Sequence, residues 1–396
     1  MTQAGGPDHQ HTAVPLWRDV RVLRVVVQVA VLLAVGIGVA YLIGNLTTAM
    51  GQRGLSFGYD FLESTAGFEI GESPIPYSAT DTYGDAFVVG LLNTLFVSLV
   101  GIVLATVLGV IIGVARLSQN WLVSRVAAGY VEVIRNTPLL VQLFLIFFAV
   151  LLQLPPVRET IALPGSVFLN QRGLFVPGPQ LGTTFGTWLA LLGAGLAVAV
   201  AARVVAARRE AAGHHAHRLG LVGLLIFIGM GVGGWVLLGA PPLTFELPVR
   251  GRFNFSGGLA LSASFTALLA GLVIYTAAFI AEVVRGGIQA VRRGQLEAAR
   301  ALGLSEGDTL RLVVFPQALR VIVPPLTSQY LNLAKNSSLA IAVGYPDLFK
   351  VGTTMANQTG QPVPVIALVM GTYLAISLTT SLLMNLYNRR VQVLEG

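Results

Sequence analysis

The segment RGGIQAVRRGQLEAARALGLSEGDTLRLVVFPQALR, residues 285–320, carries the strongest structural signal in the chain. It lies between two long apolar runs, and a segment that only joined two helices could be much shorter. Within it, Gln295–Leu302 is rich in Ala, Leu, Glu and Arg, which favour helix. Gly303 follows at a place where a residue in the left-handed conformation commonly ends a helix. The first half of the segment therefore predicts a short helix that ends just before Gly303.

The second half of the segment contains the signals of another helix start. Ser305–Asp308 approximates a capping box. Leu310, Val313 and Val314 follow at helical spacing and would give the new helix an apolar face. The two halves together predict a compact helix–turn–helix. An ordinary amphipathic hairpin lying in a membrane interface is the simpler interpretation of the same pattern.

The rest of the chain has the composition of a membrane protein. Of its 396 residues, 54% are hydrophobic and 11% are charged, and the mean hydropathy is +0.75. A soluble domain carries about 25% charged residues. These values exclude a disordered chain and argue against an ordinary soluble enzyme. The net charge of +7 does not indicate nucleic-acid binding, because the basic residues fall between apolar runs rather than on one polar face.

Stretches without Asp, Glu, Lys or Arg predict the spans, since a spanning helix needs about 20 mostly apolar residues. We expect an all-α polytopic membrane protein of about eight transmembrane helices. The seventh would run from near Pro316 to near Lys335, and Pro324-Pro325 should leave it kinked or broken. The eighth span is expected at about 365–386, because the first part of its charge-free stretch is polar. The charge-free stretches are 25–52, 86–115, 136–157, 173–202, 219–245, 253–281, 321–334 and 351–388.

Eight spans place both termini on one side, and the positive-inside rule selects that side. With an inner N-terminus, 18 of the 25 basic residues lie in inner segments and 6 in outer ones, with Lys335 at a span end. We therefore expect both termini in the cytoplasm. The first apolar run, Val25–Ile43, is longer than the core of a signal peptide, so we favour an uncleaved span.

Motifs for catalysis or nucleotide binding are absent from the sequence. The chain has no Cys, no G-x-x-x-x-G-K-[ST] loop, no H-E-x-x-H pair and no G-x-S-x-G elbow. His214 and His217 could share a helix face, but they lie among arginines without a clustered carboxylate. A lipid-headgroup or topology role is therefore favoured over a metal site. We expect this chain to be no enzyme and to bind no metal.

Several residues of the 285–320 segment match a known motif in both type and spacing. They resemble the EAA loop of ABC importer permeases, in which EAA is followed by Gly, a branched apolar residue and Leu-Pro. Here Val replaces the usual Ile and Phe the usual Leu, and both keep the apolar character. The matching residues are Glu297, Ala298, Ala299, Gly303, Val313, Phe315 and Pro316.

Three other segments resemble the permeases of the polar amino-acid uptake family, the histidine/glutamine type. They are Arg135–Gln142 (RNTPLLVQ), Ala281–Ile288 (AEVVRGGI) and Lys335–Leu339 (KNSSL). The resemblance covers about 86–152 and 259–390. It implies a five-helix permease core with an extra N-terminal helix and a two-helix insertion. That layout resembles the long permease subunit of a general L-amino-acid importer.

The resemblance implies four regions. Residues 1–85 would hold the cytoplasmic N-terminus, the first span and an outer loop. Residues 86–152 and 259–396 would form the two parts of the core, the second with the coupling loop 285–320. Residues 153–258 would be the insertion.

The resemblance also implies a non-catalytic subunit of an importer in the bacterial inner membrane. It would work with a cytoplasmic ATP-binding cassette ATPase, which holds ATP and Mg, so this chain needs no cofactor. Other partners would be a second related permease or a second copy of itself, a periplasmic amino-acid-binding protein and membrane lipids, but no nucleic acid. In the coupling loop, Glu297 would make a charged contact, Ala298 and Ala299 would permit close approach, and Gly303 would form the turn.

The solute path is harder to predict. Polar groups in a membrane normally face a cavity or another helix. For Asn93 and Thr94, hydrogen bonding between helices is the favoured interpretation. Lys335 either reaches toward the outer interface or receives a carboxylate of the solute. The candidate polar residues in or near the spans are Asn93, Thr94, Tyr275, Thr276, Glu282, Asn332, Lys335, Asn336 and Ser337.

Two other functions remain as alternatives. An ion-coupled secondary transporter of polar solutes would need intramembrane carboxylates, and no carboxylate falls centrally in a predicted span. A membrane scaffold would not need a long structured inner loop.

Overall fold

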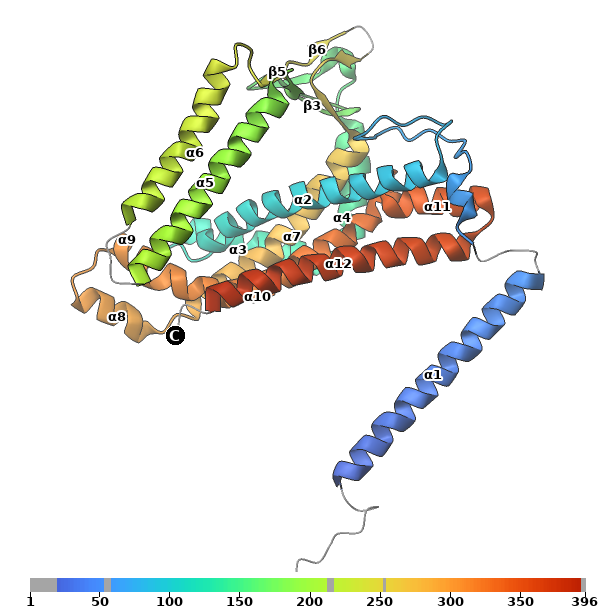
Figure 1. Cartoon of the computed structure of the whole chain (residues 1–396), viewed down its shortest axis with the longest axis horizontal. Helices are drawn as coiled ribbons and strands as arrows, with labels where there is room; N and C mark the ends of the chain where they lie inside the picture. The colour runs from blue at the N-terminus through green and yellow to red at the C-terminus, as the bar shows by residue number, and fades with distance from the viewer. Residues whose placement is uncertain (1–19, 53–57, 212–216, 252–253, 393–396) are drawn as a thin grey trace, which may run out of the picture.

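The computed structural model describes residues 20–52, 58–211, 217–251 and 254–392, and it consists mainly of long helices (Figure 1). Within these residues, seven helices are long and apolar enough to cross a membrane, and one bent pair makes an eighth candidate. The prediction of about eight apolar helices is confirmed. The long helices are α1 Val20–Gln52, α2 Tyr83–Ala115, α5 Phe185–Ala211, α6 His217–Leu237, α7 Ala263–Gln289, α10 Phe315–Asn336 and α12 Pro362–Gln392.

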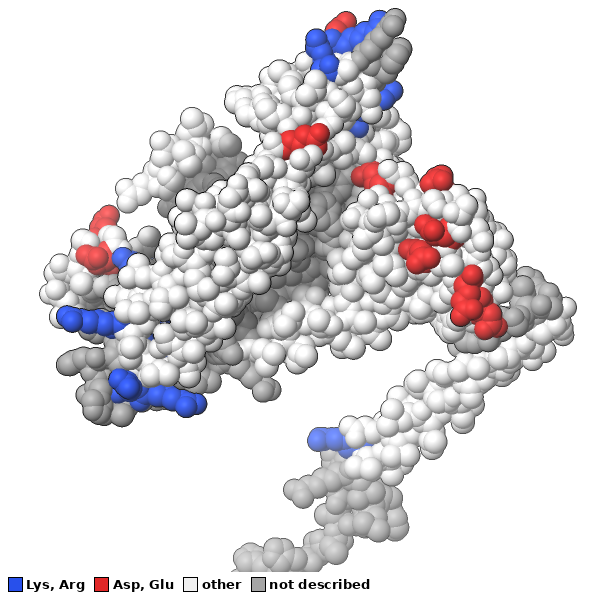
Figure 2. Space-filling view, turned by 45° about the horizontal axis from the view of Figure 1, so that its top comes forward, with Lys and Arg blue, Asp and Glu red and all other residues white. Residues whose placement is uncertain are grey.

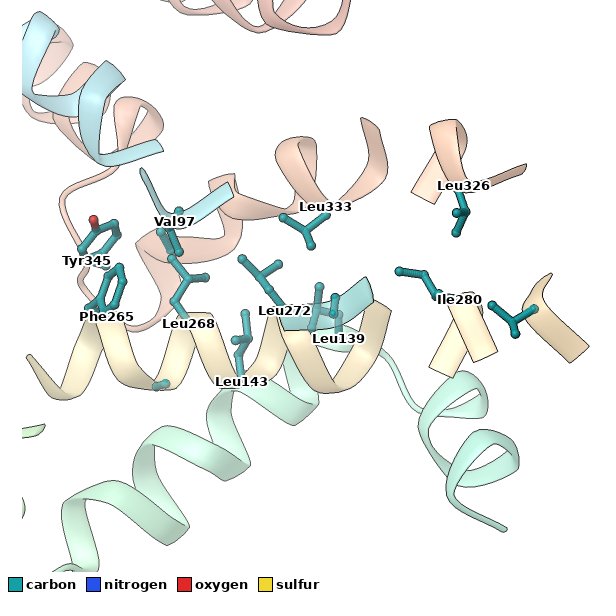
Figure 3. Packing of buried hydrophobic residues seen from close by; sticks show 14 of the residues in the cluster. Val97, Leu139, Leu143, Phe265, Leu268, Leu272, Ile280, Leu326, Leu333 and Tyr345 are labelled. Atoms are coloured by element: carbon teal, nitrogen blue, oxygen red, sulfur yellow. The ribbon is translucent and has the colours of Figure 1, made fainter. Parts of the chain in front are cut away.

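Helix α7 lies at the centre of the core, because α2, α10 and the short helix α4, Leu139–Phe144, all pack against it. Leu268 and Leu272 of α7 and Leu333 of α10 have no exposed surface (Figure 3). Phe265, near the start of α7, lies 5.5 Å from the ring of Tyr345, measured between ring centroids. The buried cluster therefore joins segments that lie far apart in the sequence.

Helices α2 and α7 approach closely because α2 presents small residues at every fourth position. Gly101, Ala105, Gly109 and Gly113 are all buried on α2. A Cβ atom added at Gly109 would lie 2.6 Å from the Cβ of Ile280. Small residues at this spacing let two membrane helices bring their backbones together. The close crossing therefore depends on the missing side chains.

The third predicted span, 136–157, is bent rather than straight. Helix α3, Trp121–Asn136, and helix α4, Leu139–Phe144, belong to two segments that meet at 106°. A π-helical turn, Leu145–Val150, and a 3₁₀ turn, Leu151–Gln153, continue α4.

The bend follows from the sequence Thr137-Pro138, because a residue before proline is disfavoured in the helical conformation. The side-chain amide of Gln142 donates to the carbonyl oxygens of Ile134 at 2.9 Å and Thr137 at 3.0 Å. These bonds satisfy two carbonyls at the open end of α3. Gln142 therefore fixes the bend.

Short strands occupy both ends of the predicted insertion, and the span prediction missed them. The charge-free stretches 173–202 and 253–281 were each expected to hold a span, but helices α5 and α7 start only at Phe185 and Ala263, and strands lie before them. A count of charged residues cannot distinguish a strand from a helix when both lack charged residues. The strands are β1 Ile161–Leu163, β2 Val167–Asn170, β3 Gly173–Val176, β4 Gly178–Leu181, β5 Leu243–Glu246, β6 Val249–Arg250, β7 Phe255–Ser256 and β8 Leu259–Ser262.

The strands form small antiparallel sheets that connect the insertion to the core. One sheet has the order β1-β2-β3-β8, and β8 leads directly into α7. Strand β4 pairs with β5, and β6 pairs with β7. Helices α5 and α6 form an antiparallel hairpin beyond these sheets (Figure 1). Trp188 of α5 fastens the hairpin, since its indole N–H donates to the carbonyl oxygen of Gly231 on α6 at 2.9 Å.

The remaining elements are short. Helix α11, Leu348–Thr359, covers part of the eighth charge-free stretch, and α12 contains the span predicted at about 365–386. The other short elements are the helices α8 Arg293–Ala301 and α9 Glu306–Thr309, the π-helical turn Leu310–Val314, and the 3₁₀ turns Asp60–Glu63, Val157–Glu159 and Ser337–Ala342.

Candidate functional site

Helix α8 and the turn after it carry the motif quoted from the 285–320 segment. Gly303 adopts the left-handed conformation, with φ of +76°. Its amide donates to the carbonyl of Arg300 at 2.9 Å, and the amide of Leu304 donates to the carbonyl of Ala299 at 3.1 Å. This pair of bonds is a Schellman motif, which ends a helix and turns the chain sharply. The predicted helix stop at Gly303 is confirmed.

The three residues of the EAA motif face in different directions. Glu297 and Ala298 are exposed, whereas Ala299 is buried against the chain itself. The Leu302 side chain, at the end of α8, is 82% exposed. Helix α8 projects at the left of Figure 1, at the same end as the C-terminus. The motif therefore presents a small, partly apolar surface on the outside of the molecule.

The second helix of the predicted helix–turn–helix is α9. It begins at the expected residue, and it continues into α10 instead of ending as a separate short helix. The Ser305 hydroxyl accepts the Asp308 amide at 3.1 Å, which caps α9. The chain then passes through the π-helical turn into α10 without a break. A π turn adds one residue and rotates the following face. Leu310, the first residue of this turn, is 56% exposed, Val313 is half-buried and Val314 is buried, so the predicted apolar face packs against the protein only at its end.

Helix α10 is continuous through its prolines. Pro316 lies exposed near the start of α10, within this continuous helical segment. Pro324 and Pro325 lie inside the helix, so the alternative of a broken helix was wrong. Both residues are exposed, so their rings displace no packed neighbour.

Asn93 and Thr94, two candidates for the solute path, are buried and hydrogen-bonded. The Asn93 amide donates to the carbonyl oxygens of Glu72 at 2.8 Å and Pro346 at 2.9 Å. The Thr94 hydroxyl accepts the amide of Leu348 at 2.9 Å. These partners are loop and helix-start groups, and Thr94 also forms a side-chain hydrogen bond with Tyr373 of the spanning helix α12. Both residues therefore hold the segment before α11 against α2.

Ser337 lies in the same buried region. It has no exposed surface, and its hydroxyl donates to the carbonyl of Ala334 at 2.8 Å. Asp347 is also fully buried, where it accepts the Lys350 amide at 2.8 Å and the Tyr373 hydroxyl at 3.1 Å. Burial raises the pKa of the Asp347 carboxyl to about 6, and the two donors act in the opposite direction. Sequence analysis did not identify Asp347, although an Asp before a short helix is a typical N-cap.

Four of the predicted path residues meet in one cavity. Tyr275 and Thr276 of α7 and Asn332 and Asn336 of α10 line a space of about 270 Å³, which we call the amide cavity. Gln329 and Phe279 complete its wall, and sequence analysis named neither. Gln329 lies one turn before Asn332, so helical spacing from the predicted residues would have found it.

Lys335 lines a different cavity. Together with Phe349 of α11 and Tyr373 of α12, it borders a largely apolar space of about 610 Å³, which we call the apolar cavity. Lys335 itself is exposed in the last turn of α10, where a cation is favoured by the helix dipole. The structure therefore separates Lys335 from the amide cavity.

Glu282 forms an ion-pair cluster near the end of α7. Its carboxylate pairs with Arg116, next to the end of α2, and with Arg285 one turn along α7. These contacts tie the ends of α2 and α7 together. Glu282 also lines a cavity with Glu132 and Arg135 of α3. His214, considered above with His217 as a metal ligand, lies outside the described residues.

Comparison with known proteins identifies the family of this chain. Residues 219–393 match the family model described as binding-protein-dependent transport system inner membrane component. The chain is 47% identical over 367 residues to YhdX of Escherichia coli (strain K12), which is named as an amino-acid ABC transporter permease. The match covers 92% of this chain and 93% of that protein. The chain belongs to the amino-acid ABC transporter permeases.

Two further relatives support this placement over nearly the whole length. The general L-amino acid transport system permease protein AapQ of Rhizobium johnstonii is 45% identical, over 89% of this chain and 88% of that protein. The glutamate/glutamine/aspartate/asparagine transport system permease protein BztB of Rhodobacter capsulatus is 42% identical, over 95% of each chain. The expected family and fold are therefore confirmed. These relatives give the ion-coupled alternative no support.

Proposed function

We propose that this amino-acid ABC permease translocates polar and charged L-amino acids. The observation that carries the proposal is the full-length similarity to AapQ and BztB, whose names specify L-amino acids in general and four polar ones. The amide cavity supports it chemically, because five of its six lining residues carry an amide or a hydroxyl group. Uptake of labelled L-glutamate and L-glutamine into proteoliposomes holding the purified transporter, with and without internal ATP, tests the proposal.

The partner for α8 is a cytoplasmic ATP-binding cassette ATPase, which binds ATP and Mg and drives transport. The exposed Glu297 and Ala298 support this, together with the largely exposed Leu302. A short helix with a small, exposed surface fits a groove on a partner, and Glu297 adds a charge-assisted contact. Closure of the ATPase would move α8 and, through the continuous α9–α10 segment, the wall of the amide cavity.

A second permease, either a related chain or a second copy, would complete the pathway. Helix α12 supports this, because one of its sides presents exposed leucines, among them Leu378 and Leu382, each about 60% exposed. A periplasmic amino-acid-binding protein would deliver the solute at the opposite end from α8. Figure 2 shows carboxylates gathered on the right of the molecule, where the segment 58–85 lies in Figure 1. That segment contains six Asp and Glu and no Lys or Arg.

The proposed orientation places both termini in the cytoplasm of a bacterial cell with an inner membrane. Reporter fusions after Asn120, Arg209 and Arg390 should report the cytoplasm, because the basic residues concentrate in those segments. Fusions after Glu72 and Arg250 should report the outside. Paired alkaline phosphatase and fluorescent-protein fusions measure this. A cytoplasmic signal after Arg250 would contradict the two-helix insertion.

Replacing Asn332 with leucine should reduce uptake about tenfold or more. A hydrogen bond to a charged group contributes about 1.5–3 kcal/mol, and about 1.4 kcal/mol corresponds to a factor of ten. Asn332 is exposed in the amide cavity, so the larger apolar side chain should not disturb a packed core. Initial uptake of labelled L-glutamine at matched protein abundance measures the effect.

Lys335→Leu provides the matched comparison. Lys335 is next to Asn336 in the sequence, but its side chain borders the apolar cavity and not the amide cavity. It should retain most of the uptake. Full uptake by Asn332→Leu together with loss in Lys335→Leu would move the solute path to the apolar cavity.

A further inference from the structure

A second polar cavity lies between the end of α2 and helices α3 and α7. It has a volume of about 420 Å³, within the range of small-molecule sites. We call it the charged cavity. Its lining residues are Arg116, Ala128, Val131, Glu132, Arg135, Asn136, Phe279 and Glu282. Phe279 also lines the amide cavity, so the two spaces are neighbours along α7. In the proposed orientation the charged cavity is the one nearer the cytoplasm.

The lining holds two arginines and two glutamates, but only Arg116 and Glu282 are paired with each other. Glu282 already has two cationic partners, Arg116 and Arg285, so that cluster carries a net positive charge. Among the described residues, neither Glu132 nor Arg135 forms an ion pair within 4.0 Å. The guanidinium of Arg135 instead lies 5.1 Å from the centre of the Phe279 ring. The cavity therefore presents one carboxylate and one guanidinium without ionic partners, one helical turn apart on α3.

A free α-amino acid has the complementary pair of charges. Its carboxylate can accept two parallel N–H bonds from a guanidinium, and its ammonium can donate to a carboxylate. The side-chain amide of Asn136 can donate a hydrogen bond to the carboxylate or accept one from the ammonium group. A simple anion would match Arg135 but would be repelled by Glu132, and a simple cation would meet the reverse conflict. The mixed charge therefore favours a zwitterion.

We propose that the charged cavity is a second amino-acid site, filled from the cytoplasmic side by the transported class of solute. Arg135 binds the α-carboxylate and Glu132 binds the ammonium group. The ligand then joins α3 to the ion-paired ends of α2 and α7. A ligand that binds one arrangement of these helices more tightly shifts the population toward it. Accumulated internal amino acid therefore slows further import.

The test uses the complete transporter in proteoliposomes, with its ATPase and binding protein. Preloading the vesicles with L-glutamine should lower the initial rate of labelled L-glutamine uptake at least threefold. Glu132→Gln should remove this inhibition while uptake into empty vesicles stays unchanged. Arg125→Gln is the control, because Arg125 lies on α3 outside the cavity lining, and it should remain inhibited. Equal inhibition of wild type and Glu132→Gln would overturn the proposal.

Binding measurements separate this site from the amide cavity and from lipid. Calorimetry of the transporter in nanodiscs, without binding protein, should show L-glutamine binding that Arg135→Gln weakens at least tenfold and Asn332→Leu leaves intact. The inference rests on the proposed amino-acid specificity, and failure of that specificity would appear as absent uptake in empty vesicles. Loss of L-glutamine binding when phosphatidylglycerol replaces neutral lipid would identify a lipid headgroup as the occupant and overturn the proposal.

Discussion

Replacing Gly303 with valine is expected to abolish ATP-driven uptake while the protein still inserts into the membrane. Gly303 has a φ of +76°, and no atom lies within 4 Å of the position of an added Cβ. The penalty therefore comes from the backbone alone, since a β-branched residue resists positive φ at a cost of about 1–3 kcal/mol. The chain would relieve this strain by opening the turn after α8. Helix α8 would then no longer fit its partner, and the ATPase should be lost on detergent extraction.

Gly303→Asn is the matched control, because asparagine tolerates the left-handed conformation. It should keep most of the uptake and most of the bound ATPase. Glu297→Ala should have an intermediate effect, since it removes one charged contact of about 1.5–3 kcal/mol from a larger interface. Uptake and copurified ATPase are measured together at matched membrane abundance. Full uptake by Gly303→Val would show that this turn does not position a coupling helix.

Replacing Gly109 with valine is expected to cause the largest loss of folded protein. An added Cβ would lie 2.6 Å from the Cβ of Ile280 and 3.0 Å from the carbonyl oxygen of Ala277. Neither atom belongs to the flexible end of a side chain, so α2 and α7 would have to separate. Overpacking of this kind typically costs about 1–3 kcal/mol, and a forced separation along a helix pair costs more. Thermal unfolding in detergent, followed by size-exclusion chromatography, should show a clearly lower midpoint.

Gly286→Val is the control for helix propensity, because Gly286 lies in α7 with no atom within 4 Å of an added Cβ. The same glycine-to-valine change is made there without a clash. Its unfolding midpoint should remain close to that of the original protein. Equal destabilisation by the two variants would show that the close approach of α2 and α7 adds nothing to stability.

The parts of the fold that depend on local sequence could be predicted. Helix α2 begins three residues before the predicted start and ends at the predicted residue, Ala115. The stop at Gly303 and the cap at Ser305 follow from short-range chemistry, and both are present. Signals of this kind need no knowledge of the neighbours.

Other features depend on contacts that a single segment does not reveal. The stretch 173–181 forms strands because β3 pairs with β8 and β4 pairs with β5, and both partners lie far along the chain. The bend before α4 needs Gln142 to bond back to Ile134, which charge counting does not detect. The π-helical turn at Leu310–Val314 adds a residue to the helix, and helical spacing alone does not show that Val314 is buried whereas Leu310 is exposed.

The candidate path residues show the same limit. Asn332 and Lys335 lie three positions apart on one helix, yet they line different cavities. Their sequence spacing does not say which way each faces, because that depends on the rotation of α10 against α7, α11 and α12. Asn93 was a candidate by polarity alone, and only the loop carbonyls explain its burial.

The pairing of β3 with β8 has a consequence for how this long chain relates to a shorter one. Val176 and Leu259 are direct partners at the end of that antiparallel ladder. The chain segment between them therefore leaves the sheet and returns to it at the same place. A two-residue turn suffices to close such a ladder. The 82 residues from 177 to 258 thus have the geometry of an enlarged hairpin loop. Evolution could therefore have gained the α5–α6 hairpin at one site, without repositioning any helix of the core.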